Sequence, residues 1–226
     1  MKVGMILTPD NRSKAYLQKI IRNKIVIDEI ILLDDGRKIT CTTEEEECAK
    51  IFEFNLSKWV KEILDDHKLK YKQFSFVDIN NVELIEYLKT LYLDFCIFSG
   101  GGILKKEILE LSTKFVHFHP GIVPNYRGST CFYYSILNDD ECGVTAFIME
   151  EGLDVGDVIC KKNFKKPNHI YVDSVYDPHI RSETLVEVLK KNLLSNDFEK
   201  QESEGETYYI IHPILKHIAI LSCEWN

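Results

Sequence analysis

Residues 93–118 of this chain read LDFCIFSGGGILKKEILELSTKFVHF. The apolar runs at 93–98 and 115–118 predict two strands, and residues 105–111 between them predict a short helix. When a helix connects two neighbouring strands of a sheet in this way, the strands are parallel. The unit therefore predicts a parallel α/β sheet, in which ligands bind beyond the carboxyl ends of the strands.

The flanking sequence continues the alternation of strands and helices. We predict further strands at 3–7, 25–33, 74–77, 144–149 and 158–164, and helices at 13–25, 42–67, from 80 or 81 to 89, and 182–194. This order predicts an α/β fold with a doubly wound, mostly parallel, Rossmann-like sheet. We expect a catalytic domain at residues 1–195 and a short C-terminal extension at 196–226 that docks on it.

Composition and charge exclude several classes of protein. The chain has 226 residues, 45% of them hydrophobic and 28% charged, which is typical of a soluble globular protein. Its seven irregularly spaced cysteines include no CxxC pair, which argues against a disulfide framework or a structural zinc site. The net charge of −8 argues against a nucleic-acid partner.

The sequence also bears on location. No run approaches the roughly 18 apolar residues of a membrane span. The apolar start of the chain is short, and Pro9, Asp10 and Asn11 follow it rather than a small-residue cleavage site. We therefore expect no membrane segment and a cytoplasmic location.

Two histidines give the first indication of chemistry. His117 and His119 are two positions apart at a predicted strand end, so both side chains point to the same side. Imidazoles placed there can transfer protons near neutral pH. From the sequence alone, the two residues can equally be buried, hydrogen-bonded histidines without a catalytic role.

Two further segments are ambiguous when each is taken alone. Asp154 lies between Gly152 and Gly156, a pattern typical of an acid in a turn. The glycines that follow Ser99 allow close approach to a flat ligand, but they do not form the GxGxxG motif of dinucleotide sites. The sequence alone does not bring Asp154 to His119.

Three pieces in order carry a specific resemblance. HPGIVPNYRG at 119–128, GVT at 143–145 and LDVG at 153–156 resemble the formyltransferases that use 10-formyltetrahydrofolate, most strongly over residues 90–165. That family acts on glycinamide ribonucleotide, methionyl-tRNA and sugar nucleotides. The resemblance implies the formyltransferase fold.

The resemblance also implies the site residues. His119 and Asp154 match the catalytic histidine and aspartate of the family, and His117 replaces the asparagine that donates a hydrogen bond to the formyl oxygen. The implied cofactor-binding residues are Gly101, Gly102, Ile103, Leu104, Glu150, Glu151, Gly152 and Leu153. The implied substrate-binding residues are Gly121, Tyr126, Arg127 and Gly128. No metal site is assigned.

The resemblance implies an N-formyltransferase that uses 10-formyltetrahydrofolate as donor and a small-molecule amine as acceptor. The segments 128–135 and 208–213 look like those of small formyltransferase-like proteins, which favours a nucleotide-linked amino sugar of surface-polysaccharide biosynthesis. Two alternatives stay open: a metal-dependent hydrolase that uses the histidine pair, and a folate-binding protein without amine formylation. A homodimer is one assembly that the sequence allows.

Overall fold

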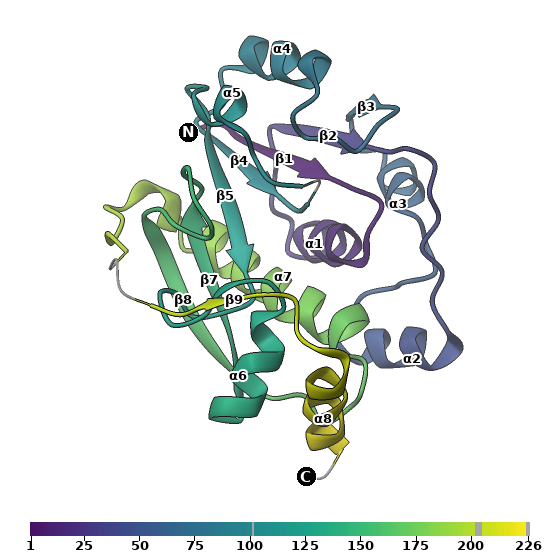
Figure 1. The fold of residues 1–226 in the computed structure, drawn as a ribbon. Helices are drawn as coiled ribbons and strands as arrows, with labels where there is room; N and C mark the ends of the chain where they lie inside the picture. Colours follow the sequence, from purple (N-terminus) through teal and green to yellow (C-terminus); the bar gives the residue numbers. More distant parts are fainter. Residues whose placement is uncertain (101, 202–204, 225–226) are drawn as a thin grey trace.

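A computed structural model describes residues 1–100, 102–201 and 205–224. Five parallel strands lie in the order β3-β2-β1-β4-β5, and two antiparallel strands, β7 and β8, complete the sheet (Figure 1). Their bounds are β1 Val3–Leu7, β2 Glu29–Leu33, β3 Lys72–Phe74, β4 Phe95–Phe98, β5 Lys114–His119, β7 Glu141–Ile148 and β8 Val158–Lys165. This arrangement confirms the predicted mostly parallel sheet.

Helices cover both faces of the sheet. Successive side chains of a strand point to opposite faces, so Met5 packs into one hydrophobic cluster and Ile6 into the other. On the Met5 side lie α1 (Asn11–Arg22), α3 (Val60–Asp66) and α7 (Asp177–Lys190). On the Ile6 side lie α4 (Val82–Leu91) and α5 (Lys106–Leu109). The two covered faces confirm the doubly wound fold.

The single helix predicted at 42–67 is wrong. Thr42 does begin a helix, with a capping box to Glu45, but α2 (Thr43–Ile51) ends early and α3 is a separate helix. The chain between them turns inward and buries Phe54 and Leu56. Burial of these two side chains outweighs the helical propensity of the charged residues around them.

Two other predicted elements are displaced along the chain. The helix predicted from residue 182 begins at Asp177, directly after a π-helical turn at Val172–Tyr176, because Pro178 is tolerated in a first helical turn. The predicted strand at 74–77 lies earlier, at β3, where its pairing with β2 ends at Phe74.

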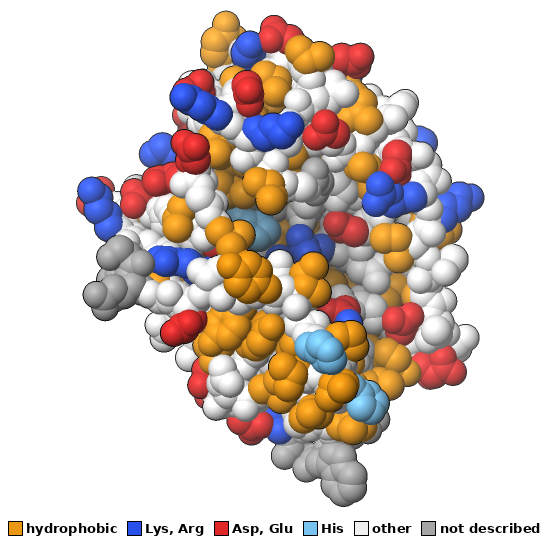
Figure 2. Space-filling model, in the orientation of Figure 1, with side chains coloured by type: hydrophobic (Ala, Val, Ile, Leu, Met, Phe, Trp, Pro, Cys, Tyr) orange, Lys and Arg blue, Asp and Glu red, His pale blue; other side chains and the backbone are white. Residues whose placement is uncertain are grey.

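The C-terminal segment packs on the body through two elements. β9 (Thr207–Tyr208) pairs with β6 (Arg127–Gly128), and α8 (Pro213–Glu224) contacts α6 (Cys131–Asp139). Ala219 and Cys223 are buried, whereas apolar side chains on the outer face of α8 are exposed. Figure 2 shows apolar side chains gathered over this part of the molecule. A domain boundary at residue 195 and a homodimer both stay predictions.

Two expectations from composition can be compared with the structure. All seven cysteines are free thiols. None of the helices in the described ranges is both long enough and apolar enough to cross a membrane.

Candidate active site

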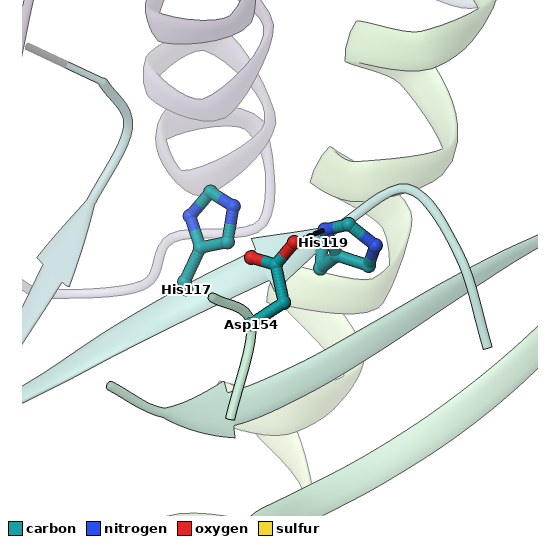
Figure 3. A group of neighbouring side chains, drawn as sticks. All are labelled: His117, His119 and Asp154. Atoms are coloured by element: carbon teal, nitrogen blue, oxygen red, sulfur yellow. Dashed lines mark ion pairs between the residues drawn. The ribbon is translucent and has the colours of Figure 1, made fainter. Parts of the chain in front are cut away.

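The two histidines lie at the carboxyl end of β5, in the middle of the sheet. Their ring centroids are 6.3 Å apart, and both rings point to the side of the strand from which Asp154 approaches (Figure 3). The intervening Phe118 points the other way and is fully buried in the core. The alternation of a strand therefore presents both imidazoles at one place.

Asp154 reaches the histidines from the turn that connects β7 with β8. Its backbone has a positive φ of 49°, and Gly152 and Gly156 on either side also have positive φ. The Asp154 Oδ2 atom accepts a hydrogen bond from the Gly128 amide at 2.7 Å. The same oxygen is 3.3 Å from Nδ1 of His119. The structure thus brings together two residues that the sequence leaves 35 positions apart.

The contacts of His119 leave a place for one proton. Its Nε2 is 2.8 Å from the carbonyl oxygen of Tyr126, so Nε2 carries the hydrogen that it donates. Burial lowers the pKa of His119, although Asp154 opposes that shift. In the neutral ring, Nδ1 therefore faces the carboxylate with a lone pair. A proton taken from a substrate would be shared between these two acceptors.

His117 is held in its neutral form. Burial places the pKa of His117 well below its ordinary value, and the positive charges of Arg181 and Arg12 add to this shift. Its Nδ1 is buried and has no hydrogen-bond partner among the described residues. A neutral imidazole carries one N–H, so the ring can donate one hydrogen bond without adding charge to the site.

A cavity of about 140 Å³ opens beside His117 and Asp154. Six of the predicted cofactor-binding residues line it: Gly102, Ile103, Leu104, Glu150, Gly152 and Leu153. Glu151 is exposed and does not belong to the lining, and Gly101 lies outside the described residues. Phe98, Phe147 and Met149 add apolar surface. The cavity suits a flat, heteroaromatic ligand whose polar edge can pair with backbone groups.

The four predicted substrate-binding residues do not line this cavity, but two of them hold His119 and Asp154 in place. Tyr126 and Gly128 make the backbone hydrogen bonds to His119 and Asp154 described above. A side chain at Gly121 would lie 2.9 Å from His119 Nε2, so only glycine fits there. Arg127 donates from Nε to Gln201. Direct contact of these residues with a substrate stays a prediction.

Sequence reasoning missed two arginines that support the site. Arg181 is buried on α7, where it donates to the Phe118 carbonyl at 2.9 Å and pairs with Asp177 at 2.7 Å. Arg12 donates to the Ser99 carbonyl. The spacing of Asp177 and Arg181, four residues apart, is the signal that could have placed the first of them on a helix.

The same three side chains have a geometry that a metal could use. One ligand atom each from His117, His119 and Asp154 lies within 4.8 Å of the other two. Two imidazoles and a carboxylate form a common ligand set for transition metals. This geometry keeps the metal-dependent alternative open.

Comparison with known sequences finds similarity to formyltransferases. A family model described as "Formyl transferase" matches residues 37–179. The methionyl-tRNA formyltransferase of Clostridioides difficile is 31% identical over 220 residues, which cover 95% of this chain and 66% of that protein. The methionyl-tRNA formyltransferase of Finegoldia magna is 37% identical over 103 residues, 44% of this chain and 33% of that protein. The matched part of the chain thus spans one third to two thirds of the length of these relatives.

Solved structures share the fold. A sugar N-formyltransferase from Shewanella sp. superimposes with a TM-score of 0.61 at 15% identity, over 99% of this chain and 88% of that one. A 4-N formyltransferase from Francisella tularensis gives a TM-score of 0.58 at 18% identity, over 98% and 87% of the two chains.

Proposed function

Because the chain belongs to the formyl transferase family, we propose that it moves a formyl group from 10-formyltetrahydrofolate to an amine. The observation that carries this proposal is the pairing of His119 with Asp154 at the edge of the cavity beside His117. The pair offers a place for a proton, and amine acylation requires a group that takes one.

The cavity residues fit the formyl donor. Gly102 and Gly152 contribute backbone to the lining of the cavity, while Phe98, Phe147 and Met149 supply apolar surface. A pterin ring has flat apolar faces and an edge of hydrogen-bonding groups, which matches this division. We place the folate of 10-formyltetrahydrofolate in this cavity, with its formyl group toward His117.

Each residue of the site then has its own role in the proposed reaction. The amine nitrogen attacks the formyl carbon, and His117 donates a hydrogen bond to the developing oxyanion. The amine proton passes to the His119–Asp154 pair, and the same proton can leave with tetrahydrofolate when the bond between the formyl carbon and the folate nitrogen breaks. Tyr126 and Gly128 keep the pair in position through their backbone hydrogen bonds.

For the acceptor we propose a nucleotide-linked amino sugar of surface-polysaccharide biosynthesis. The fold shared with a sugar N-formyltransferase along almost the whole chain supports this class. The net charge of −8 disfavours a polyanionic acceptor such as tRNA. We also expect the protein to act in the cytoplasm.

A screen tests the proposal. The protein is incubated with 10-formyltetrahydrofolate and a panel of amino-sugar nucleotides, and mass spectrometry detects products heavier by one formyl group. Reactions without the donor are the control. If folate binds but no amine in the panel gains a formyl group, a folate-binding protein without this activity becomes the better description.

A second candidate, a metal-dependent hydrolase, rests on the 4.8 Å grouping of His117, His119 and Asp154. Metal analysis of the purified protein separates the two functions. About one tightly bound zinc per chain would favour the hydrolase. Formyl transfer that persists after treatment with a chelator would favour the transferase.

A further inference from the structure

Two more hollows continue from the cavity along the carboxyl ends of the strands. The first, of about 270 Å³, contains Gly102 in its lining together with Thr8 and Asp10, which follow β1. The second, of about 320 Å³, shares Pro9 and Arg37 with the first. Neighbouring hollows share lining residues and therefore adjoin one another, and we call the series that leads away from the histidines the groove.

The far end of this groove has an aromatic wall and charged side chains of both signs, because Asp34, Glu62 and Asp65 line it together with the lysines. Trp59 forms part of the lining, and the Lys14 and Lys38 ammonium groups lie 5.2 Å and 5.6 Å from the centre of its ring. Leu32 and Val60 provide an apolar floor. A flat indole above apolar side chains is a surface on which a nucleobase can stack.

Lys14 is a buried charge in this lining. Lys14 is 1% exposed, and its ammonium group donates hydrogen bonds to the backbone carbonyls of Leu56 and Ile39 rather than to a carboxylate. A buried cation whose hydrogen-bond partners are neutral strengthens the attraction of the hollow for an anion. The apolar floor and the buried cation together suit a ligand that is both aromatic and negatively charged.

The middle of the groove is polar. Arg37 belongs to both hollows, and Asp35 binds its Nε and Nη2, which orients the guanidinium and leaves Nη1 for another anion. Guanidinium groups bind phosphate oxygens with a geometry that suits a diphosphate. Thr8 and Asp10 line the same hollow as Arg37, and their polar groups can hydrogen-bond to hydroxyl groups.

We propose that this groove binds the nucleoside diphosphate part of the acceptor. The base lies against Trp59, the diphosphate at Arg37, and the sugar beside Thr8 and Asp10, so that its amine reaches the His119–Asp154 pair. Carboxylates at the far end, such as Asp34, can accept hydrogen bonds from the ribose or the base. The inference rests on the proposed function for the location of the amine, but the nucleotide-binding surface can be tested without any reaction.

Binding of UDP and dTDP is the first test. The chain contains two tryptophans, so Trp225→Phe leaves Trp59 as the single tryptophan fluorophore. We expect saturable quenching of this fluorescence by UDP or dTDP, with uridine and inorganic pyrophosphate binding at least about ten-fold more weakly, because each lacks one half of the ligand. Quenching that does not saturate, or uridine that binds as tightly as UDP, would overturn the assignment.

Variants locate the site by calorimetry. Arg37→Ala should weaken UDP binding about ten-fold by removing a charge-assisted contact. Trp59→Leu should weaken it by roughly five- to thirty-fold through lost stacking, and a thermal melt verifies that the variant is folded. Lys89→Ala, an exposed cation on α4 that pairs with Glu86, is the matched control and should bind UDP normally. Equal affinities in Arg37→Ala and Lys89→Ala would refute the diphosphate position.

The two proposals fail in distinguishable ways. If UDP binds through Arg37 and Trp59 but no amine is formylated, the groove assignment stands and the transferase proposal fails. If an amine without a nucleotide is formylated and UDP neither binds nor competes, the transferase proposal stands and the groove assignment is wrong.

Discussion

Asp154→Asn removes the charge that faces His119 and keeps the shape of the side chain. With 3.3 Å between Oδ2 and Nδ1, a carboxylate stabilises a protonated imidazole by about 5 kcal/mol at an effective dielectric constant of about 20. This is the upper limit of what the variant can remove from a transition state in which His119 gains a proton. We therefore expect kcat to fall roughly 10³-fold, inside the range of general-base catalysis.

The same variant has a readout that needs no acceptor. Asp154 is the largest influence that raises the pKa of His119, so Asp154→Asn should lower that pKa further, as measured by NMR titration of the ring nitrogens. The amide oxygen can still accept the Gly128 hydrogen bond, so the KM for the folate donor should change little. Glu86→Gln, an exposed acid on α4, is the control. A kcat within ten-fold of the parent, or an unchanged His119 pKa, would refute the reasoning.

Three further changes test the scaffold. Gly128→Ala should lower the unfolding free energy by about 1–3 kcal/mol and should also lower kcat. The φ of Gly128 is 102°, and a Cβ at this position would lie 2.0 Å from the Tyr208 carbonyl oxygen. Denaturation and rate measurements check this. Thr145→Val should cost about 1–3 kcal/mol in urea unfolding, because its hydroxyl donates to the Gly121 carbonyl at 2.7 Å. Burial lowers the pKa of His179 to about 4, so the folded state binds fewer protons than the unfolded state and stability should fall from about pH 6.5 to pH 4; in a melting series His179→Asn should flatten this slope.

The sequence predicted the sheet well because its signals are local. Apolar runs such as 93–98 and the alternation around Phe118 depend only on neighbouring residues, and both appear as strands. The break between α2 and α3 was not predictable in this way. It depends on the burial of Phe54 and Leu56 against residues that are distant in sequence.

For the candidate site too, the residues could be predicted from the sequence but their packing could not. The resemblance of three ordered motifs to a known family was enough to single out His119 and Asp154, but their 3.3 Å approach requires the β7–β8 turn to fold back over β5. Arg181 was not predictable, because its effect on His117 depends on the packing of α7 under the sheet. Sequence motifs identify candidate functional side chains, whereas the packing around those side chains sets their pKa values.

The pairing of β6 with β9 joins distant parts of the chain near the candidate active site. Gly128, whose amide holds Asp154, lies beside Tyr208 in that pairing, and Tyr208 in turn stacks on Tyr126, whose carbonyl holds His119. A single aromatic residue, Tyr208, thus packs beside both residues whose backbone groups hold the His119–Asp154 pair. Random mutagenesis aimed at improving turnover should accordingly extend to residues 205–211, where small changes would alter the proposed proton transfer while leaving His117, His119 and Asp154 unchanged.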